Sequence, residues 1–266
     1  MDLLNPPRLD KRFIKKSFNR AAKSYDDAAI LQEEVLHRLL QRLPYIRHQP
    51  QIVVDLGCGT GKGIAGLARH YPRARIIGMD IAEQMLARAR PRFGRLRRKR
   101  LVAADLEQLP FAAQSFDLVF SSLALQWSNA AGRECARVSR PGALLMFASF
   151  GPGTLGELAA AWQMLDSRPH VHRFVDMHDV GDAMLAAGFE QPVVDAEVIR
   201  LEYGELRGLL DDLSNAGASN ADIDRCRGLT TPRKLARLED CYRQHGMRDG
   251  KFLASYEVVY GHAWCR

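Results

Sequence analysis

The segment Val53-Val-Asp-Leu-Gly-Cys-Gly-Thr-Gly61 constrains the fold of this chain more than any other part of it. A short β-branched run predicts a strand that ends near Asp55, and the three glycines then let the backbone turn tightly and approach a ligand closely. Dinucleotide-binding proteins use a related turn, G-x-G-x-x-G, to hold a pyrophosphate at the start of the next helix. Here the spacing is G-x-G-x-G, with an acidic side chain beside the turn. That combination suits a ligand that carries an ammonium group and no phosphate.

Two further carboxylates follow the next two predicted strands: Asp80 comes after residues 75–79, and Asp105 comes after residues 100–104. A carboxylate at the end of the second strand can accept both hydroxyls of a ribose. Asp105, with Leu106 beside it, is placed to contact the amino group and ring edge of an adenine. Asp is also a good helix N-cap, so one such residue alone would carry little weight. Three carboxylates at successive strand ends favour S-adenosylmethionine over NAD as the ligand.

Strands alternate with helices from residue 51 onward, which predicts a parallel sheet with right-handed crossovers. The expected strands cover residues 51–56, 75–79, 100–104, 116–120, 143–147, 192–203 and 252–264. The expected helices cover residues 11–43, a stretch that ends at residue 70, and residues 82–90, 132–138, 154–165, 179–187, 205–215 and 232–244. The last part of the sheet is thus interrupted by a helical insertion, which we expect to cover the carboxyl edge of the sheet.

Over residues 45–150 the chain resembles class I S-adenosylmethionine-dependent methyltransferases. The expected fold class is therefore α/β and Rossmann-like: a mostly parallel seven-stranded sheet with an antiparallel final strand, N-terminal helices and a helical cap insertion. We expect residues 1–44 to cover the active site, residues 45–150 to bind the cofactor, and residues 151–266 to form the cap and complete the sheet. The cofactor-binding residues that the resemblance implies are Tyr25, Gln32, Asp55, Gly57, Cys58, Gly59, Asp80, Ile81, Met85, Asp105, Leu106 and Leu123.

Outside this core, the chain is similar to the malonyl-[acyl-carrier protein] O-methyltransferases, whose methyl ester product begins pimelate synthesis for biotin. The matching pieces are FNRAAKSY at residues 18–25 with Gln32, SLALQW at residues 122–127, and AWQMLDSRPHVHRF at residues 161–174. The resemblance implies that the methyl acceptor is the free carboxylate of a malonyl thioester, carried by an acidic acyl-carrier protein or by CoA.

The implied chemistry needs no general base, because a carboxylate is already ionised at neutral pH. It needs positioning and a cation, and the planar fork of an arginine pairs bidentately with a carboxylate. We expect Arg173, and after it Arg168, to hold the acceptor carboxylate. Tyr25 is expected to close over the methyl group, and Gln126 and Trp127 to line the acceptor channel.

Three other functions compete with this interpretation. The fourth strand lacks the (N/D)-P-P-(Y/F) motif that amino-methylating enzymes often carry there, and Asn5-Pro6-Pro7 precedes the glycine turn and lacks the aromatic residue. A methyltransferase for another small acceptor, such as a quinone precursor, remains the nearest alternative. A nucleic-acid-binding relative would use the basic patches, although stacking aromatics are not interleaved with them. A cofactor-binding protein without activity is the third.

The formal net charge of +7 is compatible with nucleic acid, an anionic membrane or an acidic protein partner. Two basic segments carry much of it, residues 95–100 and the pairs Lys11-Arg12 and Lys15-Lys16. Such segments are usually solvated faces, and docking of an acidic carrier protein is only slightly favoured over that interpretation. We expect no nucleic-acid or membrane partner.

Metal binding and disulfides are not expected. His170, His172, Asp176 and His178 have a spacing compatible with metal ligands, but the reaction needs no metal and Arg173 among them would repel a cation. The five cysteines are scattered and form no CxxC pair, so they predict neither a zinc finger nor a disulfide framework. No apolar run approaches the roughly 20 residues of a membrane span, and the N-terminus lacks the apolar core of a signal peptide, so a cytoplasmic location is expected.

Overall fold

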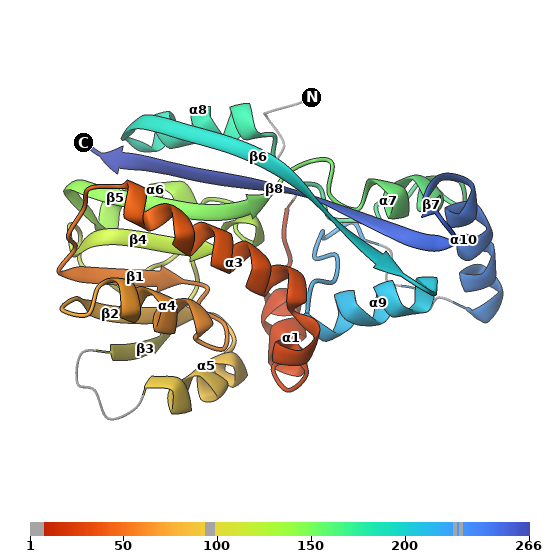
Figure 1. Cartoon of the computed structure of the whole chain (residues 1–266), viewed down its shortest axis with the longest axis horizontal. Coiled ribbons are helices and arrows are strands. Elements are labelled where there is room, and N and C mark those ends of the chain that lie inside the picture. The colour runs from red at the N-terminus through yellow and green to blue at the C-terminus, as the bar shows by residue number, and fades with distance from the viewer. Residues whose placement is uncertain (1–7, 94–98, 226–227, 229–230) are drawn as a thin grey trace.

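The parallel core is one sheet in the order β3-β2-β1-β4-β5-β8-β6, with the short strand β7 paired to β8 (Figure 1). The computed structural model describes residues 8–93, 99–225, 228 and 231–266 of the chain. The strands are β1 (Ile52–Leu56), β2 (Arg75–Asp80), β3 (Lys99–Ala103), β4 (Phe116–Ser122), β5 (Ser139–Phe150), β6 (Phe189–Tyr203), β7 (Met247–Arg248) and β8 (Lys251–Cys265).

The strand directions confirm the expected fold class. Strands β1 to β5 pair in parallel, whereas β8 runs antiparallel to both β5 and β6. The reversed final strand therefore lies between two strands that share the direction of the core. The two-residue strand β7, which makes a hairpin with β8, was not expected from the sequence.

Helices cover both faces of the sheet, as the near-continuous apolar strands require. The helices are α1 (Lys11–Ala21), α2 (Tyr25–Ala28), α3 (Ile30–Arg42), α4 (Lys62–His70), α5 (Glu83–Ala89), α6 (Ala131–Val138), α7 (Gly156–Gln163), α8 (Met177–Ala187), α9 (Leu206–Asn215) and α10 (Pro232–His245), with short 3₁₀ turns η1 (Leu43–Tyr45), η2 (Arg90–Phe93) and η3 (Leu125–Trp127). Successive residues of a strand point to opposite faces, so Val53 packs with α3 and α4 while Val54 packs with α6 and α8.

The single helix expected over residues 11–43 is wrong, because the chain forms three helices there. The backbone N–H and the side-chain hydroxyl of Ser24 both donate to the carbonyl of Ala21, at 3.0 and 3.2 Å, and close a turn after α1. The short helix α2 then carries Tyr25 toward the glycine turn, and α3 begins at Ile30. Each piece keeps helical spacing of its apolar residues, so periodicity alone does not reveal the breaks.

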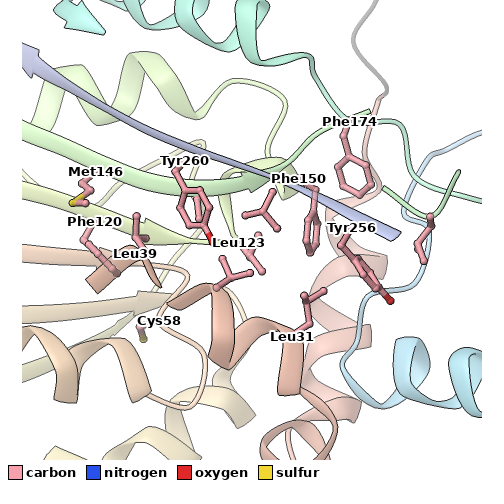
Figure 2. Packing of buried hydrophobic residues seen from close by; sticks show 14 of the residues in the cluster. Leu31, Leu39, Cys58, Phe120, Leu123, Met146, Phe150, Phe174, Tyr256 and Tyr260 are labelled. Atoms are coloured by element: carbon pink, nitrogen blue, oxygen red, sulfur yellow. The ribbon is translucent and has the colours of Figure 1, made fainter. Parts of the chain in front are cut away.

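Strands β6 and β8 are 15 residues long and extend past the rest of the sheet. Figure 1 shows α7, α9 and α10 gathered around the far end of this ribbon, and the predicted helical insertion between β6 and β8 is present as α9 and α10. Aromatic residues join the ribbon to the core (Figure 2): the ring of Phe150 on β5 lies 5.4 Å from that of Phe174 and 5.8 Å from that of Tyr256.

Candidate active site

The glycine turn after β1 holds its backbone open toward a pocket. Gly57, Gly59 and Gly61 all have positive φ, at 73°, 52° and 86°. The N–H of Gly57 donates to the carbonyl of Met79 at 2.7 Å, which ties the turn to the end of β2. A Cβ atom on Gly57 would lie 2.2 Å from the Cβ of Ala124, whereas one on Gly59 would meet no protein atom within 4 Å. The backbone at Gly59 is therefore free to approach a ligand.

Asp80, the last residue of β2, also lines this pocket. Its Oδ2 accepts from the N–H of Gly59 at 2.9 Å, and its Oδ1 accepts from the N–H of Ala82 at 2.8 Å. The side chain is buried, and burial raises the pKa of Asp80 to about 6. Each oxygen keeps a second lone pair for a further donor. The carboxylate thus has the capacity to accept the two hydroxyls of a ribose.

Asp55 presents an unsatisfied buried oxygen. Among the described residues its Oδ2 has no hydrogen-bond partner, and the residue is only 2% exposed. Burial and, to a smaller extent, the nearby charge of Asp80 raise the pKa of Asp55 to about 8. A buried carboxylate of this kind is stabilised by a cation with N–H donors. The residues present therefore fit the ammonium end of S-adenosylmethionine.

Asp105 follows β3 at the mouth of the pocket and is already paired. Its Oδ1 accepts from Nζ of Lys11 at 2.8 Å and from the N–H of Glu107 at 3.0 Å. Nζ of Lys11 also lies 3.1 Å from the carbonyl oxygen of Trp127 and 3.1 Å from Glu107 Oε1. Lys11 therefore fastens α1 over the pocket. Sequence reasoning placed Lys11 only in a basic segment, because its partners lie roughly a hundred residues away in the chain.

All twelve residues expected at the cofactor line two adjoining hollows, which we call together the cofactor pocket. The hollows share Tyr25, Gly57, Gly59 and Ser122. The first also contains Asp80, Ile81, Met85, Asp105, Leu106 and Leu123, and the second contains Gln32, Asp55 and Cys58. Tyr25 is held between them, and burial raises the pKa of its hydroxyl above the usual value.

A second, larger hollow of about 510 Å³ lies between the core and the cap, and we call it the acceptor cavity. Trp127 lines both the cofactor pocket and this cavity, so the two adjoin at its indole ring. Figure 2 shows four of the cavity's apolar lining residues, Leu31, Phe150, Phe174 and Tyr256. Its other lining residues include Gln32, Thr154, Leu158, Trp162, His170, His172, Leu201, Asp212, Leu213, Ser219 and Asn220.

The described lining of the acceptor cavity contains no lysine or arginine. His172 is buried and stacks on Trp127 with ring centroids 5.3 Å apart, and burial lowers its pKa to about 4, so it is neutral at pH 7. His170 lies 2.7 Å from Oδ1 of Asp166 and stacks on Trp162. Asp212, from α9, adds a negative charge at the cap. The cavity therefore offers a substrate carboxylate no fixed cation of its own.

The structure does not place Arg168 or Arg173 in the acceptor cavity, contrary to expectation. The segment 170–174 has no regular secondary structure: His170, Val171, His172 and Phe174 line the acceptor cavity, and residues 172–175 alternate between buried and exposed, so that Arg173 points away from it. The side chain of Arg173 is 62% exposed, and its guanidinium lies 3.6 Å from the buried carboxylate of Asp222. Arg168 is exposed and does not line the cofactor pocket or the acceptor cavity.

Gln126 also lies outside the acceptor cavity. It lines a neighbouring hollow together with Arg173, where its Oε1 accepts from the hydroxyl of Ser149 at 3.4 Å. Of the five residues expected near the acceptor, Tyr25 and Trp127 are the two that border the site.

The residues considered as metal ligands are dispersed. Within the described ranges no three His, Cys, Asp or Glu side chains are grouped so that they could hold a metal ion. His178 is exposed and lies 2.8 Å from Oδ1 of Asp176, its neighbour at the start of α8. The same ranges contain no helix long and apolar enough to cross a bilayer.

Comparisons with known proteins show the fold and the family of this chain. The family described as "Methyltransferase domain" matches residues 54–147, which span the glycine turn and β1 to β5. Among solved structures, the YcgJ protein from Bacillus subtilis has the same fold, with a TM-score of 0.62, 14% identity, and coverage of 86% of this chain and 99% of that chain.

Two curated relatives match almost the whole chain. The malonyl-[acyl-carrier protein] O-methyltransferase of Halorhodospira halophila is 50% identical and is aligned over 96% of this chain and 88% of its own. That of Laribacter hongkongensis is 48% identical, over 96% and 89%. The expected methyltransferase class and its cofactor, S-adenosylmethionine, are thereby confirmed. By its sequence similarity over almost the whole chain, this chain belongs to the family of the malonyl-[acyl-carrier protein] O-methyltransferases.

Proposed function

We propose that this chain methylates the free carboxylate of a malonyl thioester carried by an acyl-carrier protein, with S-adenosylmethionine as the methyl donor. The observation that carries the proposal is the shared wall at Trp127, which joins the cofactor pocket to a deep, mostly apolar acceptor cavity. A flexible thioester arm fits such a cavity better than a large rigid acceptor does. The names of the relatives identify a malonyl carrier protein as the substrate of those proteins.

The reaction places few chemical demands on the side chains. Transfer moves one methyl group from sulfur to a carboxylate oxygen, and no proton is gained or lost. A carboxylate with a pKa near 4 is ionised at neutral pH, so no side chain needs to act as a base. When bound, S-adenosylmethionine supplies the electrophilic methyl group and, on its sulfonium, the positive charge that the lining of the cavity lacks.

The charges around the acceptor cavity orient the substrate. Asp212 belongs to the cap, whereas Trp127 follows β4 in the core. Asp212 repels the negatively charged end of the substrate, so this end is favoured next to the cofactor pocket. The neutral part of the thioester arm can lie beside the cap without this repulsion. The neutral state of His172 leaves it available as a hydrogen-bonding partner without attracting the carboxylate away from the reacting position.

Aromatic side chains exclude water where the pocket and the cavity meet. The rings of Phe18 on α1 and Trp127 contact edge to face, with centroids 5.5 Å apart, and Tyr25 closes the adjoining wall. Exclusion of water strengthens the attraction between a carboxylate and a sulfonium and keeps the reactants in place. Tyr25 and Trp127 are therefore proposed to position the reactants, and the reaction is proposed to take place in the cytoplasm.

Mass spectrometry of carrier protein after incubation with enzyme and S-adenosylmethionine tests the proposal. Malonyl-carrier protein should gain the net mass of one CH2 unit, and cleavage of its thioester should release the monomethyl ester of malonate in place of free malonate. Malonyl-CoA and free malonate, tested in parallel, show how much the carrier contributes. Asp80→Asn, which weakens the ribose contact, should lower the yield at limiting cofactor. If no malonyl thioester is esterified while another small acceptor, such as a quinone precursor, is methylated, the proposal is overturned.

A further inference from the structure

Helix α1 presents an unbroken row of positive charge to solvent. Arg12, Lys16 and Arg20 are spaced four residues apart, so their side chains lie one above another on one side of the helix, and all three are exposed. We call these three residues the basic face. Within the part of the chain that the structure describes, none of them has an ion pair or a hydrogen-bond partner through its side chain.

The other sides of α1 contact the rest of the protein. Ile14 lines the cofactor pocket, Ser17 is buried, and Lys15, whose Nζ lies 2.8 Å from Oε1 of Glu83, faces α5. Like charges four residues apart on a helix repel each other and destabilise it. The basic face therefore lowers the stability of α1 in the isolated chain, and an anionic partner would remove this destabilisation.

The position of α1 connects this charge to the acceptor cavity. The segment 215–222 runs beside the helix along its whole length: the N–H of Asp10 donates to the carbonyl of Ala221 at 2.9 Å, and Ser24 Oγ donates to the carbonyl of Asn215 at 3.2 Å. Four residues of that segment, Ala216, Ala218, Ser219 and Asn220, line the acceptor cavity. The basic face thus lies about one helix diameter, roughly 10 Å, from the rim of the cavity.

A surface groove on this side adjoins the acceptor cavity. It is lined by Phe13 of α1 and by Arg225, and it shares His170, Ser219 and Asn220 with the acceptor cavity. The guanidinium of Arg225 lies 4.0 Å from the ring centroid of Phe13 and 3.1 Å from Oδ2 of Asp10, so it belongs to the wall and is not a free charge. The exposed cations near this groove include those of the basic face and Arg168, which directly precedes Pro169 and His170 of the groove lining.

We infer that the basic face of α1 is the docking surface for the acyl-carrier protein, and that the thioester arm enters the acceptor cavity through the groove beside Phe13. This inference rests on the proposed function. Acyl-carrier proteins are acidic, so the two surfaces are complementary in charge, and such pairs raise the rate of encounter and set the orientation of docking. Of the second basic segment considered from the sequence, residues 95–100, the first four lie outside the described residues, and Lys99 and Arg100 begin β3.

Charge reversal of the basic face separates docking from catalysis. In the variant R12E/K16E/R20E the spacing of like charges is kept, so the helix carries the same internal repulsion. With malonyl-carrier protein at low salt, we expect kcat/KM to fall about tenfold, through KM. With malonyl-pantetheine, which has no carrier and no charged arm, kcat/KM should stay within about twofold of the unaltered enzyme.

A matched control carries the same change in net charge elsewhere. Arg69, Arg73 and Arg75 are exposed and have no side-chain ion pair among the described residues. They lie at the end of α4 and the start of β2, whereas Asp80 ends β2 at the site, about 17 Å away along the strand. R69E/R73E/R75E should retain kcat/KM with the carrier substrate within about twofold, apart from a smaller effect of net charge.

Salt provides an independent readout. The advantage of malonyl-carrier protein over malonyl-pantetheine should shrink as ionic strength rises from about 0.05 to about 0.5 M in the unaltered enzyme, and should already be small in R12E/K16E/R20E. Equal losses with both substrates, no loss with either, or an equal loss in the control would overturn the inference. If the unaltered enzyme esterifies neither thioester, the proposed function fails instead.

Discussion

The charge of Asp80 raises the pKa of Asp55, its neighbour on the adjoining strand. The two side chains belong to the parallel strands β1 and β2, both are buried, and burial is the larger cause of the raised pKa in each case. Two buried carboxylates that are not matched by a cation are costly when both are ionised. A positively charged, hydroxyl-bearing ligand resolves this conflict, which is how a site for S-adenosylmethionine arises from side chains at two strand ends.

Binding of S-adenosylmethionine at pH 6.5 should release a proton. Asp55, with a pKa of about 8, is protonated in the free protein at that pH and should ionise when the ammonium group arrives. Calorimetry in buffers with different ionisation enthalpies measures the release, and the Asp55→Asn variant should lose most of it. A binding enthalpy that does not depend on the buffer would contradict the role of Asp55.

The same two carboxyl groups should make the free protein less stable as pH rises. A carboxyl group with a raised pKa in the folded state holds its proton there, while the unfolded chain ionises first. Its contribution is complete below pH 3.8 and is lost progressively up to about pH 8, the pKa of Asp55. Urea unfolding between pH 5 and 8 should therefore show a smaller loss of unfolding free energy in Asp55→Asn than in the unaltered chain; the two pH profiles should not run parallel.

Gly57→Ala and Gly59→Ala should impair the protein in different ways: the first mainly lowers its stability, and the second mainly impairs cofactor binding. At Gly57 the new Cβ would lie 2.2 Å from that of Ala124, so we expect a loss of unfolding free energy of about 3 kcal/mol or more. At Gly59 it would meet no protein atom, so only the strain of a positive φ applies, about 1–2 kcal/mol, but it would project into the cofactor pocket. Denaturation and cofactor titration together check this, and a Gly59→Ala variant with normal cofactor affinity would be inconsistent with the site.

Lys11→Ala should loosen α1. Its ion pair with Asp105 spans 2.8 Å between side chains that are 21% and 30% exposed, so its contribution is about 0.5–1 kcal/mol. Amide hydrogen exchange in α1 should accelerate by roughly two- to fivefold. Lys15→Ala is the matched control, because the pair with Glu83 has the same length but is more exposed, at 43% and 59%. Unchanged amide exchange in Lys11→Ala would show that the ion pair between Lys11 and Asp105 does not hold α1 in solution.

Arg173→Ala should leave the chemistry largely intact. Its guanidinium is exposed, pairs with Asp222 at 3.6 Å and lies outside the acceptor cavity, so kcat/KM with a malonyl thioester should change by less than about threefold. An arginine that held the substrate carboxylate directly would be worth about 1.5–3 kcal/mol, or roughly 10- to 150-fold. A loss of that size, with Arg168→Ala unaffected, would restore to Arg173 the role that the sequence suggested.

The parts of the site that could be predicted from the sequence are those that local structure determines. Gly57, Asp80 and Asp105 stand where strands end, and a parallel sheet brings its carboxyl ends to one edge. Their convergence on one pocket therefore follows from the strand pattern alone.

The remaining features depend on contacts between distant segments. Lys11 reaches Asp105 only because α1 folds back over the sheet, and the break between α1 and α3 serves the placement of Tyr25. The orientation of Arg173 could not be predicted, because it lies in a segment without regular secondary structure, and the sequence does not say which of its side chains face the cavity. The acceptor cavity itself forms between the core and a cap inserted between β6 and β8.

The most direct test of the account is to follow a carbon-13-labelled methyl group from S-adenosylmethionine into malonyl-carrier protein. The account predicts a single new methyl ester resonance on the malonyl group, formed by the unaltered chain and recovered in the monomethyl ester of malonate when the thioester is cleaved. Label that appears on carbon, on another acceptor, or nowhere on the carrier would contradict it.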